Sequence, residues 1–164
     1  MLALRRAIWA LVLAVSAPAA APARSPGEPI RGLDVVTVEV RTASGRHRYQ
    51  AEVASTPEAQ AVGMMHRREV SPAAGMLFPF TPPRPAAFWM RNTLVALDIL
   101  FIGPDGRVTG IVHRAQPLSE RLHPSPGPVA AVLELKGGEA ERIGLKVGDR
   151  VSWPGLASHR PGAR

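Results

Sequence analysis

The fold of this chain is decided by residues 75–101, GMLFPFTPPRPAAFWMRNTLVALDILF. Apolar segments on both sides enclose a compact polar set, Arg91, Asn92, Thr93 and Asp98. A polar group that is buried without a partner costs roughly 1–3 kcal/mol, so each of these side chains needs one. The set therefore either holds a sharp turn together or faces a ligand.

This stretch predicts two strands, at 86–91 and 97–102, joined by a turn at 92–94. Asp105-Gly106 is a strong hairpin signal, and it predicts a third strand at 107–113 that pairs back on the second. Residues 64–85 are rich in Pro and Met and show no regular apolar period. We therefore expect them to form a long irregular connection.

The rest of the chain adds short elements of the same kind. Residues 34–42 and 46–54 alternate apolar and polar side chains and predict a β-hairpin. Thr56 is suited to cap a short helix at 57–62, with Pro57 in its first turn. A proline-rich loop (115–128), a strand, a second short helix and a last strand follow, at 129–135, 139–143 and 150–153.

The predicted fold is mostly β, with α+β at the margin. About seven short strands and two short helices favour a small sheet that is curled or closed like a barrel. Short strands leave edges with unpaired backbone groups, and closure removes those edges.

The two ends of the chain differ from the middle. Residues 1–23 have a basic start at Arg5 and Arg6, an apolar run, and small residues before a cleavage point at Ala19 or Ala23. This layout predicts a secretory signal peptide, and a retained N-terminal anchor is the alternative. We expect a disordered leader at 24–33, one domain at 34–153 and a disordered tail at 154–164. The protein is then periplasmic or secreted, with no membrane insertion after cleavage.

Composition excludes several classes of function. The chain has no cysteine, which rules out thiol catalysis, thiolate metal sites and disulfides. The net charge is +7, of which Arg5 and Arg6 contribute two, and the remaining arginines are scattered. Single-strand nucleic-acid binders carry a basic stripe with interleaved aromatic residues. We expect no nucleic-acid partner, and a monomer.

Four segments in order resemble the domain of unknown function 192 (DUF192) family. They are STPEAQAVGMMHR (55–67), GMLFPF (75–80), FWMRNTLVALDILFI (88–102) and VLELKGGEAERIGLKVGDRV (132–151). The resemblance spans nearly all of 35–152 and implies a single compact β-rich domain, often exported, without an assigned activity. Ala96 stands where the family often has proline, and His66 where an aromatic residue is common.

The first candidate site is a small-ligand pocket. Trp89 would form an apolar wall, Arg67 would supply charge, and Asn92, Thr93 and Asp98 would supply directional hydrogen bonds. The alternative is a structural Asx-type turn, in which Asp98 accepts backbone bonds or pairs with Arg91 or Arg67. The partner is then an unknown small molecule, and an envelope protein is the alternative. No cofactor is specified.

Two other functions remain open. A Met/Trp cluster of Met64, Met65, Met90 and Trp89 suits a copper-handling protein, because thioethers favour Cu(I), although methionine also fills irregular cores. A hydrolase is the second alternative, with serines, histidines or an Asp98–Glu134 carboxylate pair. The chain has no G-x-S-x-G motif, and we assign no catalytic residue and no metal ligand.

Overall fold

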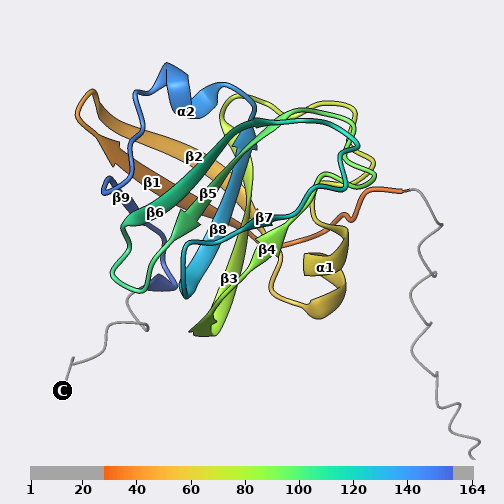
Figure 1. Cartoon of the computed structure of the whole chain (residues 1–164), viewed down its shortest axis with the longest axis horizontal. Helices are drawn as coiled ribbons and strands as arrows, with labels where there is room; N and C mark the ends of the chain where they lie inside the picture. The colour runs from red at the N-terminus through yellow and green to blue at the C-terminus, as the bar shows by residue number, and fades with distance from the viewer. Residues whose placement is uncertain (1–27, 157–164) are drawn as a thin grey trace, which may run out of the picture.

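The computed structural model describes residues 28–156, and most of the elements are strands (Figure 1). In chain order the elements are β1 (Val35–Thr42), β2 (Gly45–Val53), α1 (Pro57–Val62), β3 (Ala74–Arg84), β4 (Ala87–Phe88), β5 (Leu97–Ile102), β6 (Val108–Ala115), β7 (His123–Pro124), β8 (Val129–Lys136), α2 (Glu139–Arg142) and β9 (Arg150–Ser152).

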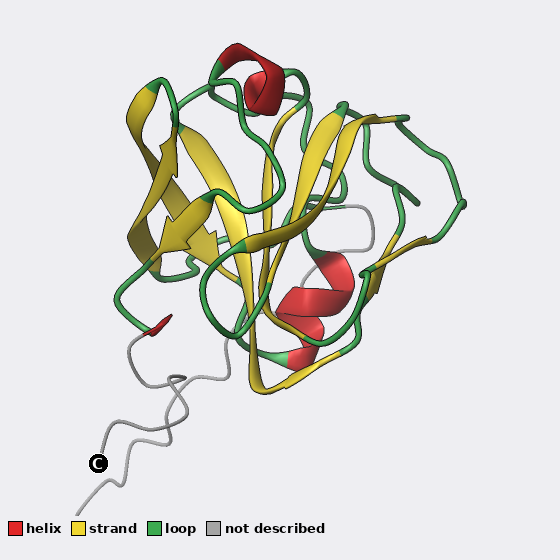
Figure 2. Ribbon diagram, turned by 60° about the vertical axis from the view of Figure 1, so that its left-hand side comes forward, coloured by secondary structure: helices red, strands yellow, loops and turns green. Residues whose placement is uncertain are grey.

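Seven of the strands form one curled sheet in the order β6-β5-β8-β3-β2-β1-β9 (Figure 2). Its two edge strands approach each other. Arg107, just before β6, bridges to Arg150 in β9, and the Val108 amide donates to the Asp149 carbonyl at 2.8 Å. The sheet is a half-barrel whose edges are tied by backbone bonds, which confirms the predicted fold class.

The pair β2–β3 is parallel, whereas the other pairs in this sheet are antiparallel. A parallel pair needs a crossover connection, and α1 provides it. The side chain of Thr56 caps α1 by accepting from the Ala59 amide at 3.1 Å, as the sequence predicts. The helix ends at Gly63, whose φ is 50° and where an added Cβ would lie 3.2 Å from the Phe78 ring.

Strand alternation sorts the core into two clusters, one on each face of the sheet. The α2 face includes Leu77, Leu133 and Leu135, packed with Ala140 and Ile143 of the α2 region. The α1 face includes Met76, Phe78 and Val132, packed with Ala59 and Met64. Neighbouring residues of β8, such as Glu134 and Leu135, therefore belong to opposite faces, and this decides where the polar side chains lie.

Two predicted segments need correction. The sequence predicts an irregular connection over all of 64–85, yet residues 74–84 form β3, because β2 and β8 supply backbone partners on both sides. The ladder with β8 shifts its register between Pro79 and Arg84, where the prolines fall. The strand predicted at 86–91 shrinks to Ala87–Phe88, since the Met90 amide bonds instead to the Ser119 carbonyl in a loop.

The predicted signal peptide lies outside the described residues, as do residues 24–27 of the leader and 157–164 of the tail. The described part of the leader is packed: Ile30 and Leu33 contact the cluster on the α1 face, and the Arg67 guanidinium donates to the Ile30 carbonyl at 3.3 Å. Leu156 likewise packs against the other cluster. Within residues 28–156, none of the helices has the length and apolar character that a membrane crossing requires.

Candidate functional site

The candidate site is built on a row of four residues across the sheet. Glu52 of β2 is in register with Met76 of β3, Met76 with Glu134 of β8, and Glu134 with Ile99 of β5. Residues in register share a face, so both carboxylates lie on the α1 face. They stand two strands apart, which at about 4.8 Å per strand separates their backbones by roughly 10 Å.

Glu134 is the central residue of this site. It is 4% exposed, and its Oε2 atom has no hydrogen-bond partner among the residues that the structure describes. Burial raises the pKa of Glu134 from its ordinary value to about 8, and the positive charge of Arg67 partly opposes that rise. The carboxyl group is therefore mainly neutral at pH 7, when it can donate a hydrogen bond as well as accept one.

Arg67 comes from the loop after α1 and pairs with Glu52. Its Nη1 donates to Glu52 Oε1 at 3.0 Å, and Nη2 contacts Glu52 Oε2. The side chain is 19% exposed, and its Nε is buried without a partner in the described part of the chain. Within the described chain, Arg67 Nε–H and Glu134 Oε2 are therefore both buried without a hydrogen-bond partner. Their side chains are close enough that the positive charge of Arg67 lowers the pKa of Glu134.

Glu134 lines a small cavity of about 40 Å³ together with Met64, Met65, Trp89 and Thr93. The cavity shares part of its wall with an open cleft of about 540 Å³. The shared residues are Gln60, Ala61, Phe78, Phe88 and Trp89. The site therefore consists of a mostly apolar cleft beside a narrow, polar cavity.

The turn at 90–93 forms the rim of this site. Asn92 has a left-handed φ of 57°, and its carbonyl accepts from the His66 amide at 2.9 Å. That bond ties the turn to the loop that carries Arg67. The buried Thr93 donates weakly to the Arg91 carbonyl at 3.4 Å, and Trp89 is 40% exposed. Trp89 and Thr93 therefore line one cavity, with Asn92 next to Thr93 in the turn, and Arg67 lies outside that cavity wall on the neighbouring loop.

Asp98 is not part of this region, which corrects the expectation that it shares a pocket with Trp89. It is in register with Leu135, on the α2 face, and is fully buried. Its carboxylate accepts from the backbone amides of Arg114, Gly138 and Ala140 at 2.7, 3.0 and 2.7 Å. Asp98 thus fixes the entry into α2, and it pairs with neither Arg91 nor Arg67.

The same alternation separates Asp98 from Glu134, so these two carboxylates lie on opposite faces of the sheet and cannot act as a pair. The methionines of the copper hypothesis are mostly packing residues. Met64 and Met90 are buried in the cluster on the α1 face, and Met65 Sδ lies 3.9 Å from Asn92 Nδ2.

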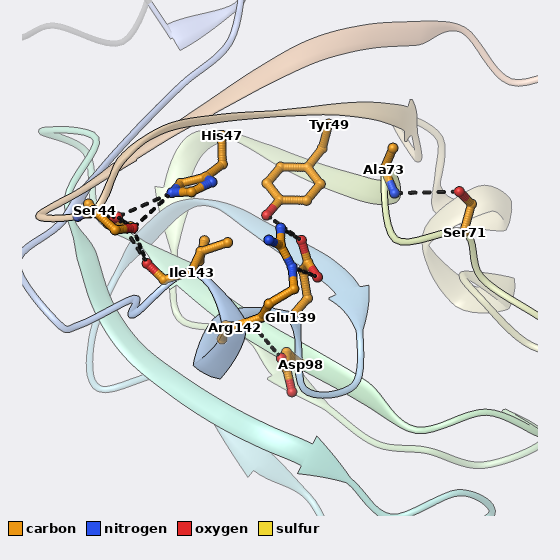
Figure 3. A network of polar contacts seen from close by, with 11 residues as sticks. Ser44, His47, Tyr49, Ser71, Ala73, Asp98, Glu139, Arg142 and Ile143 are labelled. Atoms are coloured by element: carbon orange, nitrogen blue, oxygen red, sulfur yellow. Dashed lines mark hydrogen bonds and ion pairs between the residues drawn. The ribbon is translucent and has the colours of Figure 1, made fainter.

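A second polar cluster surrounds α2 (Figure 3). The Tyr49 hydroxyl donates to Glu139 Oε1 at 2.8 Å, and Arg142 donates to both oxygens of Glu139 at 2.8 and 2.6 Å. Ser44 donates to the Ile143 carbonyl at 2.7 Å. Both oxygens of Glu139 have partners within the chain, so this cluster fastens α2 to β2.

Sequence reasoning did not select Glu134 as a binding residue. The signal was present, because Glu134 interrupts the otherwise apolar run VAAVLEL at 129–135. A carboxylate inside a buried strand is rare without a partner. Its exposure to a cavity depends on which face of β8 it occupies, and that depends on tertiary pairing.

Comparison with known proteins places the chain in a family. The model of DUF192, an uncharacterized ACR family, matches residues 38–153. The chain belongs to the DUF192 family. That assignment confirms the resemblance seen in the four sequence segments. No curated protein matches this DUF192 chain.

Two solved structures share the fold and much of the sequence. One is a protein of unknown function from Novosphingobium aromaticivorans DSM 12444, 48% identical, with a TM-score of 0.74 over 82% of this chain and 94% of that one. The other is described as a putative transcription regulator from Sinorhizobium meliloti 1021. It is 41% identical, with a TM-score of 0.72 over 76% of this chain and 97% of that one.

Proposed function

We propose that this DUF192 protein binds a small ligand in the cleft beside Phe88 and Trp89. The observation that carries the proposal is Glu134, a buried carboxyl group at a cavity that adjoins the cleft, with one oxygen that has no partner among residues 28–156. Leaving such a group unsatisfied costs roughly 1–3 kcal/mol, which a core residue would normally avoid. A ligand that bonds to Glu134 would recover that cost.

The cleft has the composition of a small-molecule site. Phe78, Phe88, Trp89 and Leu122 make most of its wall apolar, and its volume of about 540 Å³ lies within the range of ordinary ligand pockets. A few polar groups beside an apolar wall fix the orientation of a ligand.

Ala61 offers a direct test, because it is an exposed residue of α1 that lines both the cleft and the cavity. Ala61→Phe should fill the cleft while leaving the core intact. Glu58→Phe is the matched control, since it adds the same bulk to the same helix at a residue that lines neither. Thermal melting of the wild type and both variants is measured against a panel of envelope metabolites.

A ligand present at 100 times its dissociation constant adds roughly 2.7 kcal/mol of stability. We expect at least one compound to raise the melting temperature of the wild type and of Glu58→Phe but not of Ala61→Phe. An equal shift in Ala61→Phe, or no shift with any compound, would contradict the proposal.

We further propose that the protein acts in the bacterial envelope. The basic start, apolar run and small residues of 1–23 support export. Cell fractionation and N-terminal sequencing of the mature protein test this. Recovery of the uncleaved chain in the cytoplasm would contradict it.

A further inference from the structure

We propose that the ligand inserts an uncharged head group, which both donates and accepts hydrogen bonds, into the small cavity beside Glu134, while its apolar body lies in the adjoining cleft. This inference rests on the proposed function and adds the chemical class of the ligand, which is an amide or an alcohol rather than an acid or an amine. Three properties of the cavity wall support it: its charges, its hydrogen-bonding groups and its aromatic side chains.

The charges of the wall disfavour an acid. Among the residues that the structure describes, Glu134 is the one ionisable side chain that lines the cavity. An anionic head would meet no cation in this wall and would lie beside a carboxyl group. A buried charge without a counter-charge is expensive, so a carboxylate or a phosphate does not suit the cavity.

A cationic head is disfavoured for a different reason. Glu134 could pair with it only after losing a proton that burial helps it to keep, since burial raises its pKa to about 8. Arg67 lines a separate pocket, yet its positive charge acts on Glu134 and would oppose a second cation at that carboxyl group. The desolvation of two buried charges can also exceed their attraction. An ammonium group is therefore a poor match.

The polar groups of the wall suit a head that both donates and accepts. A neutral Glu134 carboxyl group has one O–H donor and one carbonyl acceptor, and its Oε2 has no partner within residues 28–156. The Thr93 hydroxyl, in the same wall, makes only a long bond of 3.4 Å to the Arg91 carbonyl. A primary amide can form two bonds to a carboxyl group at once, because its N–H donates while its oxygen accepts.

The size and the lining of the cavity place the body of the ligand. One water molecule needs about 10–15 Å³, so a cavity of about 40 Å³ takes a head of only a few heavy atoms. Phe78, Phe88 and Trp89 belong to both the cavity wall and the cleft wall. The rings of Phe78 and Phe88 meet edge to face, with centroids 4.9 Å apart. An apolar body joined to the head would therefore lie against aromatic rings in the cleft.

Isothermal titration of the purified protein at pH 7 tests the head group on one aromatic body. Phenylacetamide and 2-phenylethanol carry uncharged heads, phenylacetate and phenethylamine carry charged heads, and toluene carries no polar head. We expect both uncharged polar probes to bind about tenfold or more tightly than either charged probe, because the charged heads lose their hydration without a counter-charge in the cavity wall.

Variants of Glu134 test whether this residue holds the head. Glu134→Leu should weaken phenylacetamide binding about tenfold, the usual loss for a buried hydrogen bond, without weakening toluene binding. Glu134→Gln keeps an uncharged group that donates and accepts, so it should keep the preference for uncharged heads. Glu120→Leu is the matched control, because Glu120 is exposed and lines neither the cavity nor the cleft.

Two results would overturn the uncharged head while toluene binding preserved the cleft. One is a charged probe that binds the wild type as tightly as phenylacetamide does. The other is an unchanged phenylacetamide affinity in Glu134→Leu. Failure of every probe to bind, toluene included, would overturn the cleft as well.

Discussion

Glu52 and Glu134 point to the same side of the sheet with Met76 between them, yet Arg67 forms its ion pair with Glu52 alone. Glu52 is partly exposed and stays within reach of water, whereas Glu134 is enclosed by the loop after α1 and the turn at 90–93. Two glutamates in one row therefore have opposite electrostatic roles. One neutralises the arginine, and the other keeps its proton.

The first prediction concerns stability against pH. The pKa of Glu134 rises from its ordinary 4.5 to about 8 on folding. Below pH 4.5 Glu134 is protonated in both the folded and the unfolded chain, so its full contribution to the stability of the fold is present. Between pH 4.5 and 8 the unfolded chain releases a proton that the folded chain keeps, so stability is lost, by roughly 5 kcal/mol at about 1.36 kcal/mol per pH unit.

Urea unfolding across this range measures the effect. Glu134→Gln should lack this component of the pH dependence, while the exposed Glu120→Gln should behave as the wild type. A wild-type profile that matches that of Glu134→Gln between pH 5 and 8 would show that Glu134 titrates normally.

The second prediction concerns Arg67 and the pKa of Glu134. The charge of Arg67 lowers that pKa, so Arg67→Met should raise it further. Carboxyl carbon NMR of labelled glutamate follows the titration directly. Arg91→Met, which removes an arginine paired with exposed Glu120, should leave the pKa unchanged. A lower pKa in Arg67→Met would mean that the two side chains do not interact as the structure places them.

The third prediction separates Asp98 from the binding site. Asp98→Asn would aim an amide NH₂ or a single oxygen at three backbone donors and should cost about 3 kcal/mol or more of stability. Ligand affinity of the folded fraction should not change, because Asp98 lies on the opposite face from Glu134. Denaturant unfolding and titration on one sample test both parts. A selective loss of affinity would place Asp98 in the site after all.

The fourth prediction uses Tyr49, the single tyrosine of the chain. Burial and the hydrogen bond to Glu139 raise the pKa of its phenol well above the usual range. The phenolate absorbance should therefore appear on alkaline titration only as the protein unfolds. Tyr49→Phe should cost about 2 kcal/mol, since it removes a bond to a charged acceptor. Reversible phenolate formation in the folded protein would contradict the geometry.

Local pattern was sufficient for several elements of this fold. The alternation of residues 35–42 and 45–53 produces β1 and β2, and Thr56 and Pro57 begin α1 where they stand in the sequence. These features depend on backbone geometry and on neighbours within a few residues, which a sequence contains. The composition alone excluded cysteine chemistry, and four motifs alone indicated the DUF192 family.

Tertiary structure decided the rest. β3 forms from a proline-rich segment because β2 and β8 supply its partners from elsewhere in the chain. The faces on which Asp98 and Glu134 lie also follow from strand register, in which a shift of one residue exchanges the two sides. The sequence places Asp98 and Trp89 close together along the chain, whereas the sheet divides them and sets Glu134 beside Trp89 and Thr93 instead.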